Sequence, residues 1–136
     1  MSGKLLVDTS AWIVSFRKTG NEKLKKSLIA ALDSLSVATT NIIILELLQG
    51  CRNKNEYDAM TSRLNALETF PVSSDVWSLA YNTGYELRRK GITVSTVDII
   101  IAAVAKTYNC SLLHHDKHFR PIAKHLHINA VDFVDE

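Results

Sequence analysis

The chain carries four carboxylates beside apolar runs that must be buried. Asp8 and Asp116 each follow a short apolar run that predicts a strand. Asp98 opens the stretch STVDIIIAAVAK, in which seven consecutive apolar residues follow the acid. Glu46 lies inside IIILELLQ, whose apolar neighbours leave little room for a fully exposed acid. Functional groups of a parallel sheet gather at the carboxyl ends of its strands, so these four acids are the candidates for chemistry.

Each acid also has a purely structural interpretation. Asp8 suits the turn or cap before a helix, and Asp98 suits the first turn of a helix, where the helix dipole favours negative charge. Glu46 could be a half-exposed helix acid, and Asp116 could be a turn residue. Taken together, the purely structural interpretations become less convincing. Three of the four acids fall where a strand ends or a helix begins, at the same predicted edge of the sheet.

If the four acids lie close together, their negative charge determines which kind of ligand can bind between them. Carboxylates within a few ångströms of one another repel, and some stay protonated unless a cation neutralises them. A donor set made of oxygens favours Mg²⁺ or Mn²⁺ over zinc. Mg²⁺ completes its shell with waters and substrate phosphate oxygens, and a divalent ion lowers the pKa of the attacking water. The pattern therefore predicts metal-dependent hydrolysis of a phosphodiester.

Strand-like and helix-like segments alternate along the chain. We expect strands at residues 4–7, 36–39, 69–72, 111–114 and 129–134. We expect a first helix from Thr9 or Ser10, a second helix capped by Asn21, and further helices over 40–50, 55–67, 73–91, 96–108 and 120–126. This alternation predicts an α/β fold, a three-layer α/β/α sandwich with a central parallel sheet of four to five strands. Residues 1–136 are expected to form a single domain, and the pattern leaves the strand order open.

Composition bounds the class of protein. The 136 residues are 46% hydrophobic and 22% charged, with a net charge of +2, which suits a globule with a weak preference for a polyanionic partner. Cys51 and Cys110 have no paired spacing, so we expect free, buried thiols in a reducing compartment. No apolar run approaches the ~20 residues of a membrane span, and the first residues do not resemble a signal peptide. We expect a soluble, cytoplasmic protein.

The C-terminal region contains all five histidines, which are His114, His115, His118, His125 and His127. The spacing of His114 and His118 would suit joint metal binding on a helix, but His114 is expected to end a strand, which disfavours zinc. We interpret the histidines as surface and turn residues. We expect His114 or His115 to lie near the acids and to add positive charge at low pH.

Two sets of apolar side chains have open interpretations. One set fits a partly exposed groove and fits core packing equally well, and it consists of Trp12, Phe16, Leu28, Leu32, Tyr57 and Met60. The other set repeats at four-residue steps and fits either the core or a dimer interface, and it consists of Trp77, Tyr81 and Tyr85.

Four stretches of the chain resemble the PIN-domain family, and within it the VapC-type ribonuclease toxins of prokaryotic toxin–antitoxin pairs. The stretches are LLVDTSAWI, IIILELLQG, STVDIIIAAVA and LLHHDKHF, in the family's order over positions 5–119. Each stretch alone is a weak motif, whereas the ordered set is specific. Matched residue by residue, Asp8, Glu46, Asp98 and Asp116 take the family's acidic metal-binding positions, and Ser10 takes a small polar position beside the first acid.

The resemblance implies a fold, an activity and partners. It implies parallel strands between helices, a homodimer, Mg²⁺- or Mn²⁺-dependent endoribonuclease activity on RNA, and inhibition by a cognate antitoxin whose C-terminal segment enters an apolar groove. Basic groups at Arg52/Lys54 and at 88–90 are then candidates to line the path of the RNA, with Arg88 and Arg89 as candidate substrate contacts.

One position departs from the family pattern. His114, two residues before Asp116, stands where relatives usually carry Thr or Ser, and its imidazole is larger and titrates near neutral pH. This departure keeps open an alternative function, a catalytically inactive PIN-like module that binds RNA or protein. A phosphoacceptor signalling domain also fits the α/β pattern, but the adjacent acidic pair after the first strand is missing. Ser10 stands where a phosphatase built on Asp-x-Asp would need its second acid.

Overall fold

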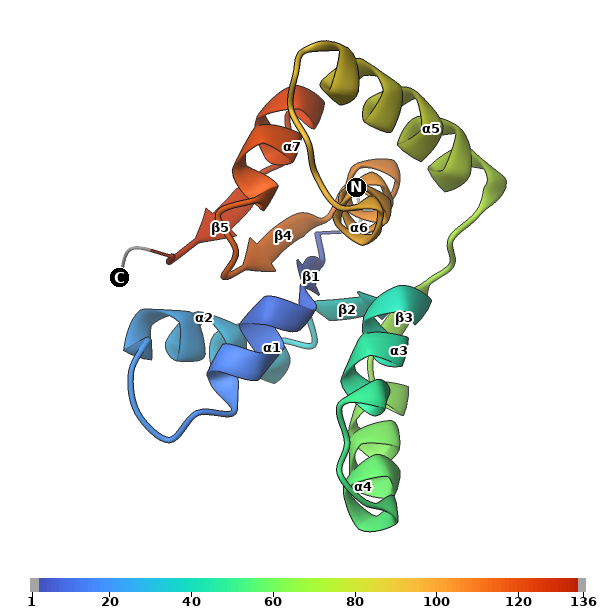
Figure 1. Ribbon diagram of the computed structural model, residues 1–136. Helices are drawn as coiled ribbons and strands as arrows, with labels where there is room; N and C mark the ends of the chain where they lie inside the picture. Colours follow the sequence, from blue (N-terminus) through green and yellow to red (C-terminus); the bar gives the residue numbers. More distant parts are fainter. Residues whose placement is uncertain (1–2, 135–136) are drawn as a thin grey trace.

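The computed structural model describes residues 3–134, which fold around a five-stranded parallel sheet (Figure 1). The strands are β1 (Leu5–Val7), β2 (Val37–Thr40), β3 (Glu68–Phe70), β4 (Ser111–His114) and β5 (Ala130–Asp132). Their order is β3-β2-β1-β4-β5, and every neighbouring pair is parallel. The predicted strands are confirmed, with bounds that agree at β4 and are shifted by one or two residues elsewhere. The strand order, which the sequence pattern leaves open, places β1 at the centre.

Seven helices connect the strands within the described residues. They are α1 (Thr9–Ser15), α2 (Glu22–Asp33), α3 (Asn41–Gln49), α4 (Lys54–Asn65), α5 (Ser74–Arg89), α6 (Thr96–Thr107) and α7 (Phe119–Leu126). In Figure 1, α5, α6 and α7 lie on one side of the sheet and α1 and α2 on the other, while α3 and α4 project beyond the β2–β3 end. The predicted three-layer α/β/α sandwich is confirmed.

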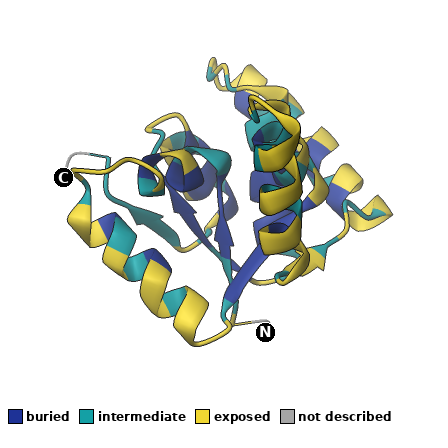
Figure 2. Cartoon of the chain, turned by 90° about the horizontal axis from the view of Figure 1, so that it is seen from below, coloured by how far each residue is buried: buried dark blue, intermediate teal, exposed yellow. Residues whose placement is uncertain are grey.

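The core lies where β1, β4 and α6 meet. Leu6 and Val7 of β1 are fully buried, as are Leu112 and Leu113 of β4. Residues 100–105 of α6 are all buried as well, so this helix runs through the interior and exposes only its ends. Figure 2 shows the central strands in dark blue and the outer faces of the peripheral helices in yellow. A parallel sheet covered on both faces needs such continuous apolar strands.

Local capping matches the sequence in some helices and departs from it in others. The Ser73 hydroxyl caps α5 by accepting a hydrogen bond from the Val76 N–H, as predicted. Asn21 does occupy the N-cap position of α2, but its side chain makes no capping hydrogen bond. Its backbone is left-handed (φ 55°), whereas a capping side chain works from an extended backbone. Thr40, at the N-cap of α3, instead donates its hydroxyl to the Phe70 carbonyl on β3, at 2.7 Å.

The aromatic stripe on α5, which consists of Trp77, Tyr81 and Tyr85, is exposed and does not belong to the core. Trp77 is 40% exposed, Tyr81 70% and Tyr85 60%. The rings of Trp77 and Tyr81 stack on each other with centroids 6.1 Å apart. The interpretation of the stripe as core is therefore wrong, because α5 buries the opposite face of the helix, which carries Val76, Ala80, Thr83 and Leu87.

Neither Cys51 nor Cys110 forms a disulfide within residues 3–134, and Cys110 is buried while Cys51 is only half-buried. Between residues 3 and 134, every helix is too short or too polar to cross a membrane.

Candidate active site

Four carboxylates meet at the carboxyl edge of the sheet and form what we call the acid cluster. Asp8 follows β1, Glu46 lies on α3, Asp98 lies in the first turn of α6, and Asp116 follows β4. Asp98 and Glu46 both raise the pKa of Asp8 through their negative charge, and Asp116 and Glu46 act in the same way on Asp98. Asp98 is therefore within electrostatic reach of the other three acids that the sequence singles out, and their joint role as a metal site stays a prediction.

Asp8 is the most deeply placed acid, with only 4% of its surface exposed. Burial raises the pKa of Asp8 to about 6, and the charges of Asp98 and Glu46 act in the same direction, against the lowering effect of hydrogen bonds from Ser10. The carboxylate accepts the Ser10 N–H at 2.9 Å and the Ser10 hydroxyl at 2.5 Å. Asp8 is also the N-cap of α1, so its structural interpretation is correct and coexists with its place in the acid cluster.

Ser10 ties the first acid to the fourth strand. Its hydroxyl donates to Asp8 and accepts a hydrogen bond from the backbone N–H of His115, at 2.9 Å. One hydroxyl thus joins the start of α1 to the end of β4, the segment that leads to Asp116. Ser10 is a positioning residue, in keeping with the small polar position that the family resemblance implies.

Thr9 orients Glu46 and is a site residue that the sequence reasoning missed. The Thr9 hydroxyl donates to Glu46 Oε1 at 2.7 Å across 37 residues of sequence. The available signal was its place directly after Asp8, in the first turn of α1, from which a hydroxyl can reach a neighbouring helix. Glu46 itself is half-buried, which agrees with the expectation that its apolar neighbours restrict it.

Asp98 lies in the first turn of α6 and is not the residue that caps this helix. The cap is Ser95, whose hydroxyl accepts the Asp98 N–H at 3.0 Å. This leaves the Asp98 carboxylate half-buried at the N-terminus of α6. Burial raises the pKa of Asp98, the negative charges of Asp116 and Glu46 add to the rise, and the hydrogen bond with Ser95 and the charge of His118 oppose it. Asp98 therefore does not cap α6, and its carboxylate lies within reach of the charges of Glu46 and Asp116.

His118 is the histidine that contacts an acid of the cluster, a contact that the sequence reasoning also missed. Its backbone N–H and its Nδ1 lie 2.9 and 2.8 Å from Asp116 Oδ1. The imidazole is exposed (68%), and the Asp116 carboxylate is more enclosed (36%). His118 is thus a neighbour of the acid cluster whose ring lies within hydrogen-bond distance of the Asp116 carboxylate.

His114 is a buried residue, and the interpretation of this histidine as a surface or turn residue is wrong. Its side chain is fully buried, and its ring packs on Phe119 with centroids 5.1 Å apart. Burial lowers the pKa of His114, so the neutral imidazole is favoured and the expected positive charge at low pH is not supplied here. His114 Nδ1 accepts the backbone N–H of Asp116 at 3.2 Å, so this residue holds the loop that carries the fourth acid.

An open groove of about 650 Å³ runs beside the acid cluster. Its walls come from α1, α3 and α4, and Glu46 lies in its lining together with Phe16, Met60 and Arg63. Phe16 and Met60 thus fulfil the prediction of an apolar groove, whereas Trp12 and Leu28 belong to the core. The remaining two candidates of that set, Leu32 and Tyr57, line other hollows.

Arg88 and Arg89 lie outside the acid cluster, at the last turn of α5. They line a second hollow, of about 510 Å³, which also contains Thr96 and Ile99 of α6. Thr96 and Ile99 bracket Asp98 in the sequence, so the two arginines approach the acid-bearing end of α6 without joining the acids.

The donor chemistry of the acid cluster fits a hard divalent cation. Its candidate ligands are carboxylate oxygens, and two of the four, Asp8 and Asp98, have a pKa raised by burial and by their negative neighbours. Such a cluster lacks positive charge at its centre. Over residues 3–134, no group of three His, Cys, Asp or Glu side chains is positioned to hold a metal ion. Mg²⁺ binds through one or two carboxylates and keeps several waters, so its binding does not require three protein ligands.

Fold and site together define an α/β protein with an acid cluster at the carboxyl edge of a parallel sheet. The sequence pattern of the PIN domain matches residues 5–125. The chain belongs to the PIN domain family, which confirms the resemblance stated from the sequence.

Known proteins are similar to this chain over nearly their whole length. The VapC ribonuclease Mb1587 of Mycobacterium bovis is 28% identical over 132 residues, which cover 95% of this chain and 98% of that protein. Ribonuclease VapC18 of Mycobacterium tuberculosis is 26% identical over 121 residues, covering 86% and 85%. A solved structure of VapBC2 from Rickettsia felis, bound to a DNA fragment from its promoter, has a TM-score of 0.77 at 17% identity and covers 95% of this chain and 98% of that one.

Proposed function

We propose that this protein is a metal-dependent endoribonuclease that acts as the toxin of a toxin–antitoxin pair. The observation that supports the proposal is the acid cluster, whose members Asp8, Glu46, Asp98 and Asp116 come from four separate segments and include two acids with a raised pKa. Burial, together with negative neighbours, raises the pKa of Asp8 and of Asp98, so their charged forms cost stability that a bound cation would return. Relatives named as VapC ribonucleases support the substrate class.

The acid cluster would hold Mg²⁺ or Mn²⁺. Asp8 and Asp98 are the leading candidate ligands. Burial and neighbouring negative charges raise the pKa of both, so a bound cation would stabilise their charged forms. Glu46 and Asp116 would complete the site directly or through water. When bound, the ion supplies charge neutralisation of the phosphate and a lowered pKa of the attacking water.

The protein's own groups would orient the reaction around these ligands. Ser10 fixes the Asp8 carboxylate through two hydrogen bonds, and Thr9 fixes Glu46 at 2.7 Å. With one oxygen held by Thr9, Glu46 keeps its second oxygen available to orient a water. His118, exposed beside Asp116, is placed to donate a hydrogen bond at the rim of the acid cluster.

A cognate antitoxin would be the regulatory partner. A solved relative is a VapBC toxin–antitoxin complex, and another is FitAcB from Neisseria gonorrhoeae, with a TM-score of 0.71 at 21% identity. The groove of about 650 Å³ that ends at Glu46 is the candidate site for an antitoxin segment, because an occupant of this groove would reach the acid cluster. Growth arrest on expression of the chain, relieved by co-expression of its antitoxin, is the expected result.

A homodimer remains a prediction, and the exposed aromatic stripe on α5 supports it. Stacked rings at Trp77 and Tyr81 form an apolar face of the kind that a second copy would cover. Sedimentation of the parent protein beside the Trp77→Ser/Tyr81→Ser variant tests this prediction, and a monomeric parent would contradict it.

RNA cleavage assays test the enzymatic proposal. Purified protein should cut single-stranded RNA with Mg²⁺ or Mn²⁺ and should stop when EDTA is added. Asp98→Asn should reduce cleavage to background while the melting temperature stays at or above that of the parent. The same substitution should abolish growth arrest in cells. Equal cleavage by the parent and by Asp98→Asn would remove the acid cluster from the chemistry.

The alternative is a PIN-like module that binds RNA or protein without turnover. The observation in its favour is that residues 3–134 contain no set of three ligating side chains arranged as a metal cage. Under this alternative the parent would bind RNA and leave it intact at every Mg²⁺ or Mn²⁺ concentration. The cleavage assay therefore separates the two functions.

A further inference from the structure

Two hollows at the far end of α5 meet at Ile92 and are both lined by basic side chains. The first, which we call the α5–α6 hollow, is the one of about 510 Å³ that Arg88 and Arg89 line. The second, the α5–α7 hollow, has about 600 Å³ and is lined by Lys90 and Lys124 among others. Because Ile92 lines both, the two hollows are neighbours at the loop from α5 to α6.

From this geometry we infer that the two hollows bind the RNA strand on one side of the scissile phosphodiester, with the α5–α6 hollow taking the nucleotide nearest the acid cluster. The inference rests on the proposed ribonuclease function and extends it to the substrate path. Helix α6 connects the α5–α6 hollow to the acid cluster. Thr96 and Ile99 of this helix line the hollow, and Asp98, which lies between them in the sequence, belongs to the acid cluster. A strand leaving the acid cluster along this end of α6 enters the α5–α6 hollow first.

The chemistry of the α5–α6 hollow matches a nucleotide. Arg88 and Arg89 supply guanidinium groups that bind phosphate in a bidentate manner. Ile92, Val94 and Ile99 supply an apolar surface on which a base can lie. A volume of about 510 Å³ lies within the range of roughly 300–1,000 Å³ that small-molecule sites have.

Arg89 is held in place before any ligand arrives. Its Nη1 donates to the Tyr85 hydroxyl at 2.9 Å, and its guanidinium carbon lies 5.6 Å from the centre of the Tyr85 ring. A cation fixed on an aromatic ring loses less conformational freedom on binding phosphate than a free side chain does. Tyr85 and Arg89 therefore form a prepared cationic and aromatic edge of the kind that binds single-stranded nucleic acid.

The α5–α7 hollow is prepared in a similar way. Lys90 Nζ lies 3.1 Å from His125 Nδ1, and His125 Nε2 lies 3.1 Å from Glu86 Oε2. An ammonium can only donate, so His125 Nδ1 accepts from Lys90 and Nε2–H donates to Glu86. Lys90 is thereby held beside the α5–α7 hollow, and Lys124 on α7 lies in the same lining.

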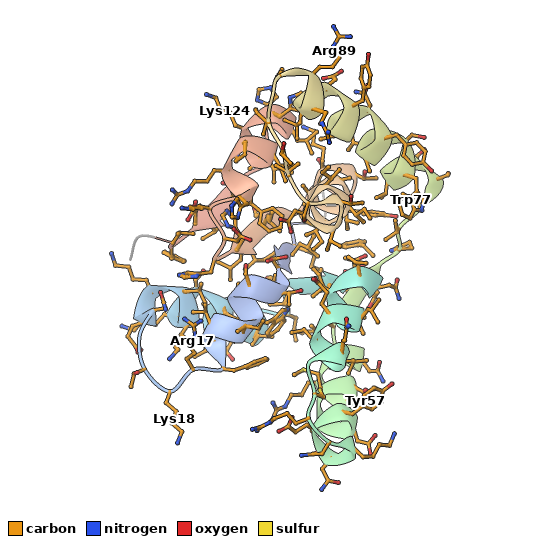
Figure 3. All side chains as sticks on the ribbon, viewed as in Figure 1. Arg17, Lys18, Tyr57, Trp77, Arg89 and Lys124 are labelled. Carbon is orange, nitrogen blue, oxygen red and sulfur yellow. The ribbon has the colours of Figure 1, made fainter. Side chains whose placement is uncertain are left out.

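Charge complementarity selects RNA as the occupant. The two hollows are lined by four Arg or Lys side chains, which are Arg88, Arg89, Lys90 and Lys124, and neither lining includes an acid. Figure 3 shows Arg89 and Lys124 at the same end of the molecule and Lys18 at the opposite end. A nucleic-acid strand carries a series of negatively charged phosphates, which complement this row of positively charged side chains.

The test compares three double variants, each of which removes two positive charges. Arg88→Gln/Arg89→Gln alters the α5–α6 hollow, Lys90→Gln/Lys124→Gln alters the α5–α7 hollow, and Lys18→Gln/Lys26→Gln is the control on exposed residues elsewhere. Affinity for a fluorescent single-stranded RNA is measured over a range of salt concentrations, with Asp98→Asn present in every protein to prevent cleavage. Each hollow variant should bind about tenfold more weakly, and its salt slope should fall by about 0.7 for each phosphate that the variant no longer neutralises. The control should match the parent.

RNA length and cleavage provide the second readout. Cleavage of a long RNA by protein that retains Asp98 should lose kcat/KM in both hollow variants, whereas a substrate too short to reach the α5–α7 hollow should be unaffected by Lys90→Gln/Lys124→Gln. Hollow variants that bind and cleave RNA as the control does would overturn the inference and leave the ribonuclease function intact. Variants that lose antitoxin binding but keep RNA affinity would also overturn it. A parent protein that neither binds nor cuts RNA would refute the proposed function and the RNA path together.

Discussion

Replacing Asp8 by Asn should stabilise the metal-free protein at neutral pH. The buried Asp8 carboxylate has its pKa raised from 3.8 to about 6, so the folded state is destabilised when this group ionises. Asn is neutral at every pH, has nearly the same shape, and keeps an oxygen that can accept the Ser10 N–H as a helix cap. The substitution therefore removes the charge and leaves the capping hydrogen bond.

The size and direction of the effect follow from the shift. Because the folded pKa lies above the unfolded value, the parent has its full stability below about pH 4 and loses it as the pH rises through 6. At about 1.4 kcal/mol for each pKa unit, the complete loss is about 3 kcal/mol. Asp8→Asn should thus be more stable than the parent by up to about 3 kcal/mol at pH 7.5, and by less than about 1 kcal/mol at pH 4.

Urea unfolding in EDTA at several pH values measures this difference. Asp33→Asn is the matched control, because it removes an exposed carboxylate at the end of α2 and should show no pH-dependent gain. Addition of Mg²⁺ should stabilise the parent more than Asp8→Asn, since the variant has lost a charged ligand. A variant that is less stable than the parent at pH 7.5 in EDTA would refute the account of Asp8 as a buried charge that opposes folding.

Three further substitutions separate positioning, capping and packing. Thr9→Val removes the hydroxyl that holds Glu46 and should lower the RNA cleavage rate about 10–100-fold with little change in melting temperature, in a steady-state assay with a melting-temperature control. Ser95→Ala removes the cap that accepts the Asp98 N–H and should lower the unfolding free energy by about 1 kcal/mol in urea titrations. Ile101→Ala opens a cavity in the fully buried middle of α6 and should cost about 2–5 kcal/mol by the same measurement.

The sequence is sufficient for those features of the fold that depend on local pattern. Short apolar runs predict all five strands, and the four acids stand out because each lies next to such a run or within one. Ser73 or Ser74 is predicted as the cap from its place before an apolar-periodic stretch, and the structure has Ser73 in that role. These features share one property, since each depends on residues only a few positions apart.

Features that depend on distant residues could not be predicted in the same way. The burial of His114 depends on Phe119 folding back over the end of β4, and the exposure of Tyr81 depends on which face of α5 packs against the rest of the protein. The contact between Thr9 and Glu46 joins two helices that the chain order alone does not place side by side. Asn21 shows the limit even for a local rule, since a favourable cap residue lies in a left-handed turn instead.

The central place of β1 has a consequence for how the chain is made on the ribosome. β1 emerges well before one of its two neighbours, β4, which begins about a hundred residues later. A nascent polypeptide that stops before Ser111 has one edge of its middle strand unpaired and lacks Asp116 altogether. Translation products that stop before β4 should therefore be harmless to the cell, because harmful activity would arise only after β4 and Asp116 have been made.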